Sequence, residues 1–141
     1  TMLPVGPWTV ASGENDGQPL FVRLNTGAAA VAGHATLAHR VGIAVPLREP
    51  DAAGLPTATE AAILTQIEDA IEGAFRVGHE TILAVVLTTG GMREFVLYSA
   101  APQSVQASVA AVQAQFPKYQ IQSYTQPDTE WDGYAAFSDA L

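Results

Sequence analysis

The 141-residue sequence predicts an α+β domain in which an antiparallel sheet carries two helices on one face. Three observations lead to this prediction. Several stretches alternate apolar and polar residues, two others repeat apolar residues at helical spacing, and the pair Gly90-Gly91 separates two adjacent apolar runs. We expect residues 1–141 to form a single domain, because no linker composition interrupts a chain of this ordinary length.

The N-terminal third predicts a loop, two strands and an ambiguous segment. Residues 13–19 (GENDGQP) concentrate turn-forming residues and predict a tight loop. Residues 20–25 then alternate, which indicates a strand. In residues 39–47 every second residue from position 41 onward is apolar, which indicates a strand with one apolar face. The small residues of 27–38 fit either a short helix or an irregular crossing.

The segment after Thr57 predicts an amphipathic helix that ends near Gly78. Thr57 and Glu60 have the spacing of a capping box, in which the Thr side chain accepts the N–H of the Glu and the Glu reaches back. Apolar residues then recur at intervals of three and four. Glu60, Glu68 and Glu72 are expected to form a solvated helix face.

The C-terminal half predicts a hairpin, a helix and a last strand. Residues 81–89 and 92–99 are rich in apolar and β-branched residues and flank the glycine pair. Pro102 suits the first position of a helix whose apolar face ends before Pro117. Residues 118–125 alternate cleanly and indicate a final strand.

The order from His39, β-α-β-β-α-β, is the ferredoxin-like or split βαβ arrangement, with one or more extra N-terminal strands before it. The extra strand is expected to extend an edge or to pair with the last strand. Strict alternation places one set of residues under the helices: Val41, Ile43, Val45, Leu83, Val85, Leu87, Phe95, Leu97, Tyr119 and Ile121. The other face then carries Gly42, Ala44, Ala84, Val86, Val96, Tyr98, Gln120, Gln122 and Tyr124.

The predicted second face is semi-apolar and bears tyrosines, so we expect something to cover it. Three alternatives are open for what covers this face. The N-terminal segment with Trp8 or the C-terminal aromatic residues fold over it, a second copy or a protein partner packs on it, or a ligand lies beneath the aromatic residues.

Charge and composition exclude several classes of function. Fourteen acidic and six basic residues give a net charge of -8 with no basic stripe, which disfavours direct nucleic-acid binding and anionic membranes. The chain has no cysteine, which excludes thiolate chemistry and fits a cytoplasmic protein. The first residues show no signal-peptide pattern, and the longest apolar run, 82–87, is too short to cross a bilayer.

The sequence predicts no catalytic residues, no metal site and no cofactor. The three histidines lack metal-ligand spacing, and no nucleophile elbow or phosphate-binding loop is present. Asp128, Glu130 and Asp132 are closely spaced acids, but the loop of a calcium site would not place Trp131 between them. We expect Asp128 to cap a helix that carries Trp131 and Tyr134 on one face. An enzyme is therefore disfavoured.

Five residues form the candidate binding surface: Arg93, Tyr98, Tyr124, Trp131 and Tyr134. The favoured function is a non-catalytic domain that works by contact with a protein partner or by self-association. The alternative is a small-molecule-binding domain or a minor enzyme with a pocket around Arg93, Tyr98, Trp131 and Tyr134. In that pocket Arg93 would anchor an anion.

Three motifs carry a family resemblance: GLPTATEAAILTQIEDAI, TTGGMREFVLYS and the final D-x-x-W-x-x-Y-x-x-F. Together they resemble an uncharacterised bacterial family of domains of unknown function, over residues 8–137. That family is similar in turn to the regulator of ribonuclease E activity B, which implies a ferredoxin-like fold and a non-enzymatic regulatory role. Asp132-Gly133-Tyr134 matches an Asp-Gly-aromatic region of that regulator. Trp131 precedes the pair here, so no binding residue is carried over.

Overall fold

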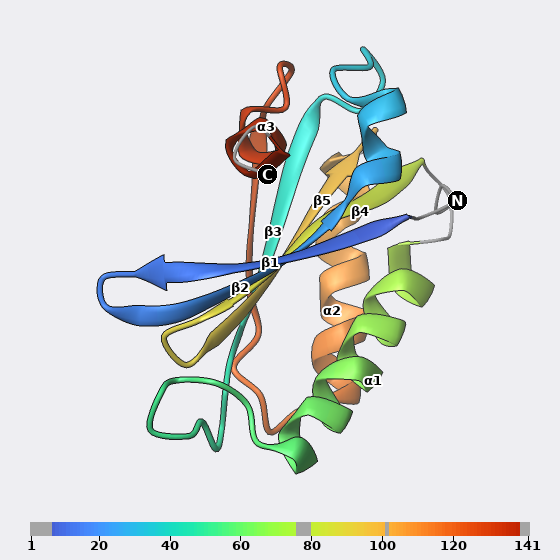
Figure 1. Cartoon of the computed structure of the whole chain (residues 1–141). Helices are drawn as coiled ribbons and strands as arrows, with labels where there is room; N and C mark the ends of the chain where they lie inside the picture. Colours follow the sequence, from blue (N-terminus) through green and yellow to red (C-terminus); the bar gives the residue numbers. More distant parts are fainter. Residues whose placement is uncertain (1–6, 76–79, 101, 139–141) are drawn as a thin grey trace.

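The structure is a computed structural model that describes residues 7–75, 80–100 and 102–138. A six-stranded sheet has the order β1-β2-β4-β5-β3-β6, with every neighbouring pair antiparallel (Figure 1). Its strands are β1 (Trp8–Asn15), β2 (Gln18–Asn25), β3 (His39–Pro46), β4 (Thr81–Thr89), β5 (Met92–Ser99) and β6 (Gln122–Pro127). The helices are α1 (Ala58–Phe75), α2 (Val105–Gln115) and α3 (Asp132–Ser138), with 3-10 turns η1 (Thr26–Val31) and η2 (Pro102–Ser104). The α+β prediction is confirmed.

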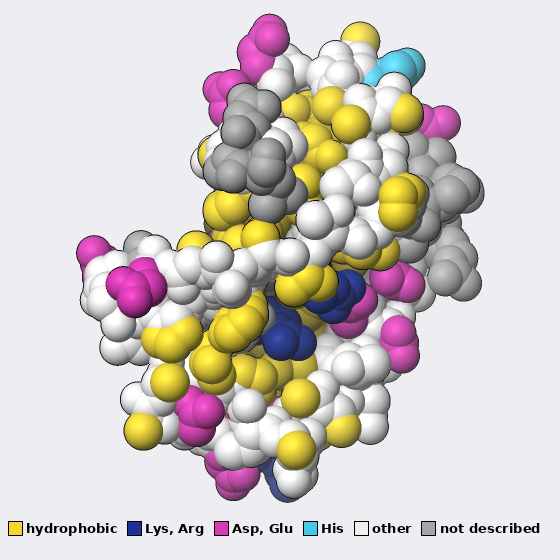
Figure 2. All heavy atoms as spheres, viewed as in Figure 1, with side chains coloured by type: hydrophobic (Ala, Val, Ile, Leu, Met, Phe, Trp, Pro, Cys, Tyr) yellow, Lys and Arg dark blue, Asp and Glu magenta, His cyan; other side chains and the backbone are white. Residues whose placement is uncertain are grey.

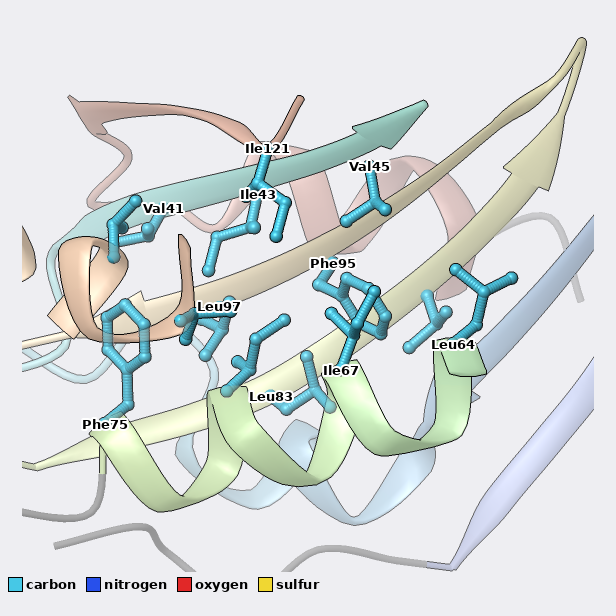
Figure 3. Packing of buried hydrophobic residues seen from close by; sticks show 14 of the residues in the cluster. Val41, Ile43, Val45, Leu64, Ile67, Phe75, Leu83, Phe95, Leu97 and Ile121 are labelled. Carbon is cyan, nitrogen blue, oxygen red and sulfur yellow. The ribbon is translucent and has the colours of Figure 1, made fainter. Parts of the chain in front are cut away.

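Helices α1 and α2 lie together on one face of the sheet, here called the helix face (Figure 1). Leu64, Ile67 and Phe75 of α1 point toward the strands and are fully buried (Figure 3). They meet residues that alternation assigned to this face: Val41, Ile43, Val45, Leu83, Phe95, Leu97 and Ile121. The helical and strand periodicities both predicted these buried residues correctly, because the single layer formed by α1 and α2 packs on a single face of the sheet.

The opposite side of the sheet, the second face, is covered in part by the C-terminal residues. Trp131 and Tyr134 pack there with Tyr98 and Val96 of β5, and Leu37 joins the same buried cluster. The C-terminal aromatic residues therefore cover this region, which was one of the three alternatives expected from the sequence. Trp8 lies instead against the helix-face cluster.

Strand β4 contains an irregularity that reverses part of the predicted alternation. Leu83 pairs with Leu97 but Val85 pairs with Val96, so Ala84 is an extra residue. After this β-bulge, Val86 joins the helix-face cluster, and Val85 joins the second-face cluster. The assignments of Val85, Val86 and Leu87 were wrong, because an unbroken apolar run contains no polar residue that would mark a change of phase.

The N-terminal region forms a hairpin of two strands, of which only the second, over residues 20–25, was located in the sequence. Asp16 and Gly17 have φ angles of 51° and 78°, which identify a type I′ turn between directly paired Asn15 and Gln18. The predicted loop 13–19 is thus confined to its centre. The hairpin extends the β4 edge, whereas the last strand β6 lies at the opposite edge beside β3.

One further boundary differs from expectation. The last strand runs over Gln122–Pro127 and not 118–125, and Tyr119 before it reaches to α1, where its hydroxyl donates to Glu60. The ambiguous segment 27–38 contains the 3-10 turn η1 and then irregular chain. The predicted end of the first helix at Gly78 lies outside the described residues.

Candidate functional site

The sheet divides the five residues predicted as a binding surface. Tyr98, Trp131 and Tyr134 lie together on the second face, and all three are buried. Tyr124 is on the same face near its β6 edge, with 41% of its surface exposed. Arg93 lies on the helix face, since it alternates with Glu94 and Val96 along β5 and shares its side with buried Phe95. Arg93 and these aromatic residues therefore lie on opposite faces of the sheet and do not line a common pocket.

Trp131 is a structural centre of the second face. Its ring stacks on Tyr98 at 3.9 Å between centroids with an interplanar angle of 8°, and Tyr134 meets it edge-on. The indole Nε1 donates to the Leu37 carbonyl at 2.8 Å. Trp131 precedes α3 and has a φ of 57°, a left-handed conformation that costs a non-glycine residue about 1–3 kcal/mol. The expected helical position of Trp131 was therefore wrong.

Asp128 collects four hydrogen bonds beneath the start of α3. Tyr98 donates its hydroxyl at 2.7 Å, and the backbone N–H groups of Asp132 and Gly133 donate at 2.8 and 3.0 Å. Arg40 Nη1 donates at 3.2 Å. Burial alone would raise the pKa of Asp128, but these donors hold it below its ordinary value. The predicted capping role is confirmed, with Trp131 intervening between the cap and the helix.

Arg40 links the hydrogen-bonded group around Asp128, here called the polar centre, to Tyr124 on the edge strand β6. Its guanidinium lies over the Tyr124 ring at 6.0 Å, and its buried Nε has no hydrogen-bond partner among the described residues. Gly133 leaves the space that this guanidinium fills, because a Cβ there would collide with Arg40 Nη1. Sequence reasoning missed Arg40, and no local signal reveals it, since its partner Asp128 is 88 residues away.

A second polar cluster, the arginine notch, lies on the helix face and consists of Arg23, Glu68, Thr88 and Arg93. Arg23 donates to both carboxylate oxygens of Glu68, each at 3.0 Å, and its guanidinium lies 4.9 Å from the ring centre of Trp8. Arg93 Nε donates to the Thr88 hydroxyl at 2.9 Å. Figure 2 shows basic side-chain atoms gathered near the centre of this view, beside apolar atoms and close to acidic ones.

Glu60 is buried, with only 3% of its surface exposed, and is not part of a solvated helix face. Its own N–H is accepted by Thr57 Oγ1, which confirms half of the capping box. The carboxylate does not return to Thr57. It accepts the N–H groups of Arg48 and Glu49 and so fastens the loop before α1.

Hollows are present on both faces of the sheet. One of about 670 Å³ lies between α1 and α2 and includes Gly73 and Phe116. Another, of about 330 Å³, lies on the second face between Phe137 and the strands, with Leu87 and Met92 in its wall. Neither is lined by Arg93 or by the buried aromatic residues. Among the residues that the structure describes, no three His, Asp or Glu side chains gather as a metal site, and no helix is long and apolar enough to span a membrane.

The strand β1 is an open edge of the sheet. None of the described residues pairs with its outer side, and β1 and β2 project beyond the helices (Figure 1). Val10 on this strand exposes 67% of its surface, and Phe21 on β2 exposes 43%. The composition of β1, with small residues between Val10 and Glu14, gave little strand signal in the sequence.

The comparisons with known proteins agree with the motif-based resemblance to an uncharacterised family. A family model described as a family of unknown function (DUF695) matches residues 7–138. No curated protein and no solved structure matches the chain. The matched range contains all six strands, both helices of the helix face and the residues that surround Asp128. The chain therefore belongs to the DUF695 family of unknown function.

Proposed function

We propose that this chain is a non-catalytic protein-interaction domain that pairs with a second copy of itself through β1. One observation carries the proposal: the outer side of β1 pairs with none of the residues that the structure describes, and exposed apolar side chains lie beside it. Edge strands of natural proteins are commonly protected by charge, proline or coverage, because their free backbone groups bind other strands. Residues 8–13 contain no charged residue and no proline.

The type I′ turn determines which backbone groups of β1 are free. In a two-residue hairpin the pair that flanks the turn, here Asn15 and Gln18, exchanges both hydrogen bonds, and the pattern then alternates along the strands. Ala11 and Gly13 accordingly direct their backbone groups toward β2. Ser12 and Val10 direct their backbone N–H and C=O groups outward, where an added strand would form hydrogen bonds with them.

The apolar, uncharged character of β1 favours a second copy as the partner. Val10 exposes 67% of its surface, and residues 8–13 carry no charge. Two copies related by a two-fold axis pair their β1 strands antiparallel. This arrangement joins the exposed Val10 side chains of the two copies to a common apolar surface.

The fold and the resemblance support the same proposal. The four strands β4-β5-β3-β6, with α1 and α2 on one face, have the strand order of the ferredoxin-like arrangement. We retain the similarity to the regulator of ribonuclease E activity B as a prediction. A regulatory role through protein contact follows from that similarity and from the open edge.

Sedimentation velocity over a concentration series tests this proposal. We expect the wild type and Ser12→Ala to form a dimer, and Ser12→Pro to remain monomeric, because proline removes one outward N–H and leaves the β1–β2 hydrogen bonds in place. Circular dichroism of both variants checks that the hairpin still folds. A wild type that stays monomeric throughout, or a folded Ser12→Pro that dimerises like Ser12→Ala, would refute pairing through β1.

A further inference from the structure

We propose that the arginine notch binds a single carboxylate group attached to an apolar body, with Arg93 as its principal ligand. This inference does not require the self-association, because its principal ligand Arg93 is on β5, the fourth strand from the β1 edge. The site is also distinct from the pocket expected from the sequence, which paired Arg93 with aromatic residues now known to lie on the other face.

The charges in the notch are unequal. Two guanidinium groups, those of Arg23 and Arg93, face one carboxylate, that of Glu68. Arg23 occupies both Glu68 oxygens in a bidentate pair. Glu68 thus acts on Arg93 only through its charge and not through a hydrogen bond, and the notch retains one net positive charge in a protein whose net charge is -8.

Arg93 is partly buried without a full set of acceptors. Its Nε donates to Thr88, but none of the described residues accepts a hydrogen bond from its two terminal nitrogens. Burial lowers the pKa of Arg93, and the neighbouring charge of Arg23 lowers it further. A partly desolvated guanidinium recovers solvation when it meets an anion, and its planar fork matches the two oxygens of a carboxylate.

The surroundings select the kind of anion. Arg93, Thr88 and Phe21 pair successively across three strands, so Phe21 stands in the same row on the same face, and it exposes 43% of its surface. Beside this row, the guanidinium of Arg23 is already engaged by Glu68 and covered by Trp8. One uncompensated charge next to an apolar side chain fits a monoanion with a hydrocarbon part better than a phosphate dianion. The acidic remainder of the chain repels a dianion more strongly.

The carboxylate could belong to a free organic acid or to the side chain of an extended peptide. Titrations of the full chain, followed by backbone amide NMR shifts at Thr88 and Arg93, would compare four probes: acetate, hexanoate, inorganic phosphate and acetyl-Val-Glu-Val-amide. We expect hexanoate to bind more tightly than acetate. Tighter binding of the peptide than of hexanoate would assign the site to a protein carboxylate, and the reverse order would assign it to an organic acid.

Variants separate the notch from general charge effects. Arg93→Gln should weaken hexanoate binding by about tenfold or more, since a charge-assisted hydrogen bond contributes about 1.5–3 kcal/mol. Arg48→Gln makes the same change of charge at an exposed position outside the notch and should leave binding unchanged. Arg93→Lys should be intermediate, because the charge remains but the fork is lost.

Three results would overturn the proposal. No probe changes the notch resonances of the wild type, or the two glutamine variants lose affinity equally, or phosphate binds as tightly as hexanoate with the same dependence on Arg93. Failure of Ser12→Pro to abolish dimers would leave this titration unaffected, so the two proposals fail separately.

Discussion

Replacing Asp128 by asparagine tests the polar centre beneath α3 without changing its shape. Oδ2 accepts from Tyr98, Arg40 and Gly133, and Oδ1 accepts from the Asp132 N–H. The amide will turn its NH2 group toward the single donor at Asp132, because the other orientation opposes three donors. One partly buried backbone N–H, that of Asp132, then loses its acceptor, which costs about 1–3 kcal/mol, and loss of the partly exposed ion pair adds about 1 kcal/mol.

Urea denaturation at neutral pH, followed by tryptophan fluorescence and circular dichroism, measures the effect. We expect the free energy of unfolding to fall by about 2–4 kcal/mol in Asp128→Asn. Glu130→Gln is the control, since it removes an exposed carboxylate in the same turn and should change stability little. If the two variants unfold at the same urea concentration, the four hydrogen bonds to Asp128 do not stabilise the C-terminal region and the reasoning fails.

The same variant has a predictable dependence on pH. The pKa of Asp128 is lower in the folded chain than its ordinary value, so the folded state binds the proton less well than the unfolded state. Its contribution is complete above the ordinary aspartate pKa of about 4 and disappears as the pH falls through the folded-state pKa. The stability difference between wild type and Asp128→Asn should therefore shrink on acidification.

Four other substitutions are tested by chemical denaturation. Trp131→Ala should lower stability by about 3–5 kcal/mol, as expected for a buried aromatic residue, and an unchanged unfolding midpoint would show that the ring contributes nothing to the fold. Gly133→Ala should lower the stability of the protein, because the added Cβ displaces the Arg40 side chain. Gly73→Ala is the control, since open space surrounds that position, and it should stabilise α1 by up to about 1 kcal/mol. Equal effects of the two substitutions would contradict the close contact between Gly133 and Arg40. Glu60→Gln should cost about 1–3 kcal/mol at neutral pH and less in acid, since hydrogen bonds lower the pKa of Glu60 against the effect of its burial; a loss that is constant with pH would refute this.

The parts of the fold that were predictable are those set by local pattern. Helix α1 has a regular apolar repeat, and the β4–β5 hairpin has two glycines with positive φ angles between two apolar strands. The bulge at Ala84 was not predictable, because its neighbours on both sides are apolar and either face accepts them. The strand β1 was not located because residues 11–13 are small and Val10 and Glu14 are exposed, so this stretch carries almost no alternation.

The candidate sites depended on contacts between distant residues, which sequence periodicity does not report. Asp128 was recognisable as a helix cap, but its bonds to Arg40 and Tyr98 come from other strands. Arg93 was grouped with Tyr98, Trp131 and Tyr134, and strand alternation placed it on the opposite face of the sheet from all three. Its actual neighbour Arg23 lies in β2, a strand with which β5 does not pair.

The position of the aromatic cover at residues 131–137 has a consequence for synthesis of the chain. A ribosome makes the six strands before it makes Trp131, so a nascent sheet exposes Val96 and Tyr98 until the last turn is complete. A chain released before Asp128 would keep that apolar surface and would lack the cap beneath α3. Chaperones and proteases recognise such surfaces, so premature termination near this point should yield a product that is degraded rather than one with partial activity.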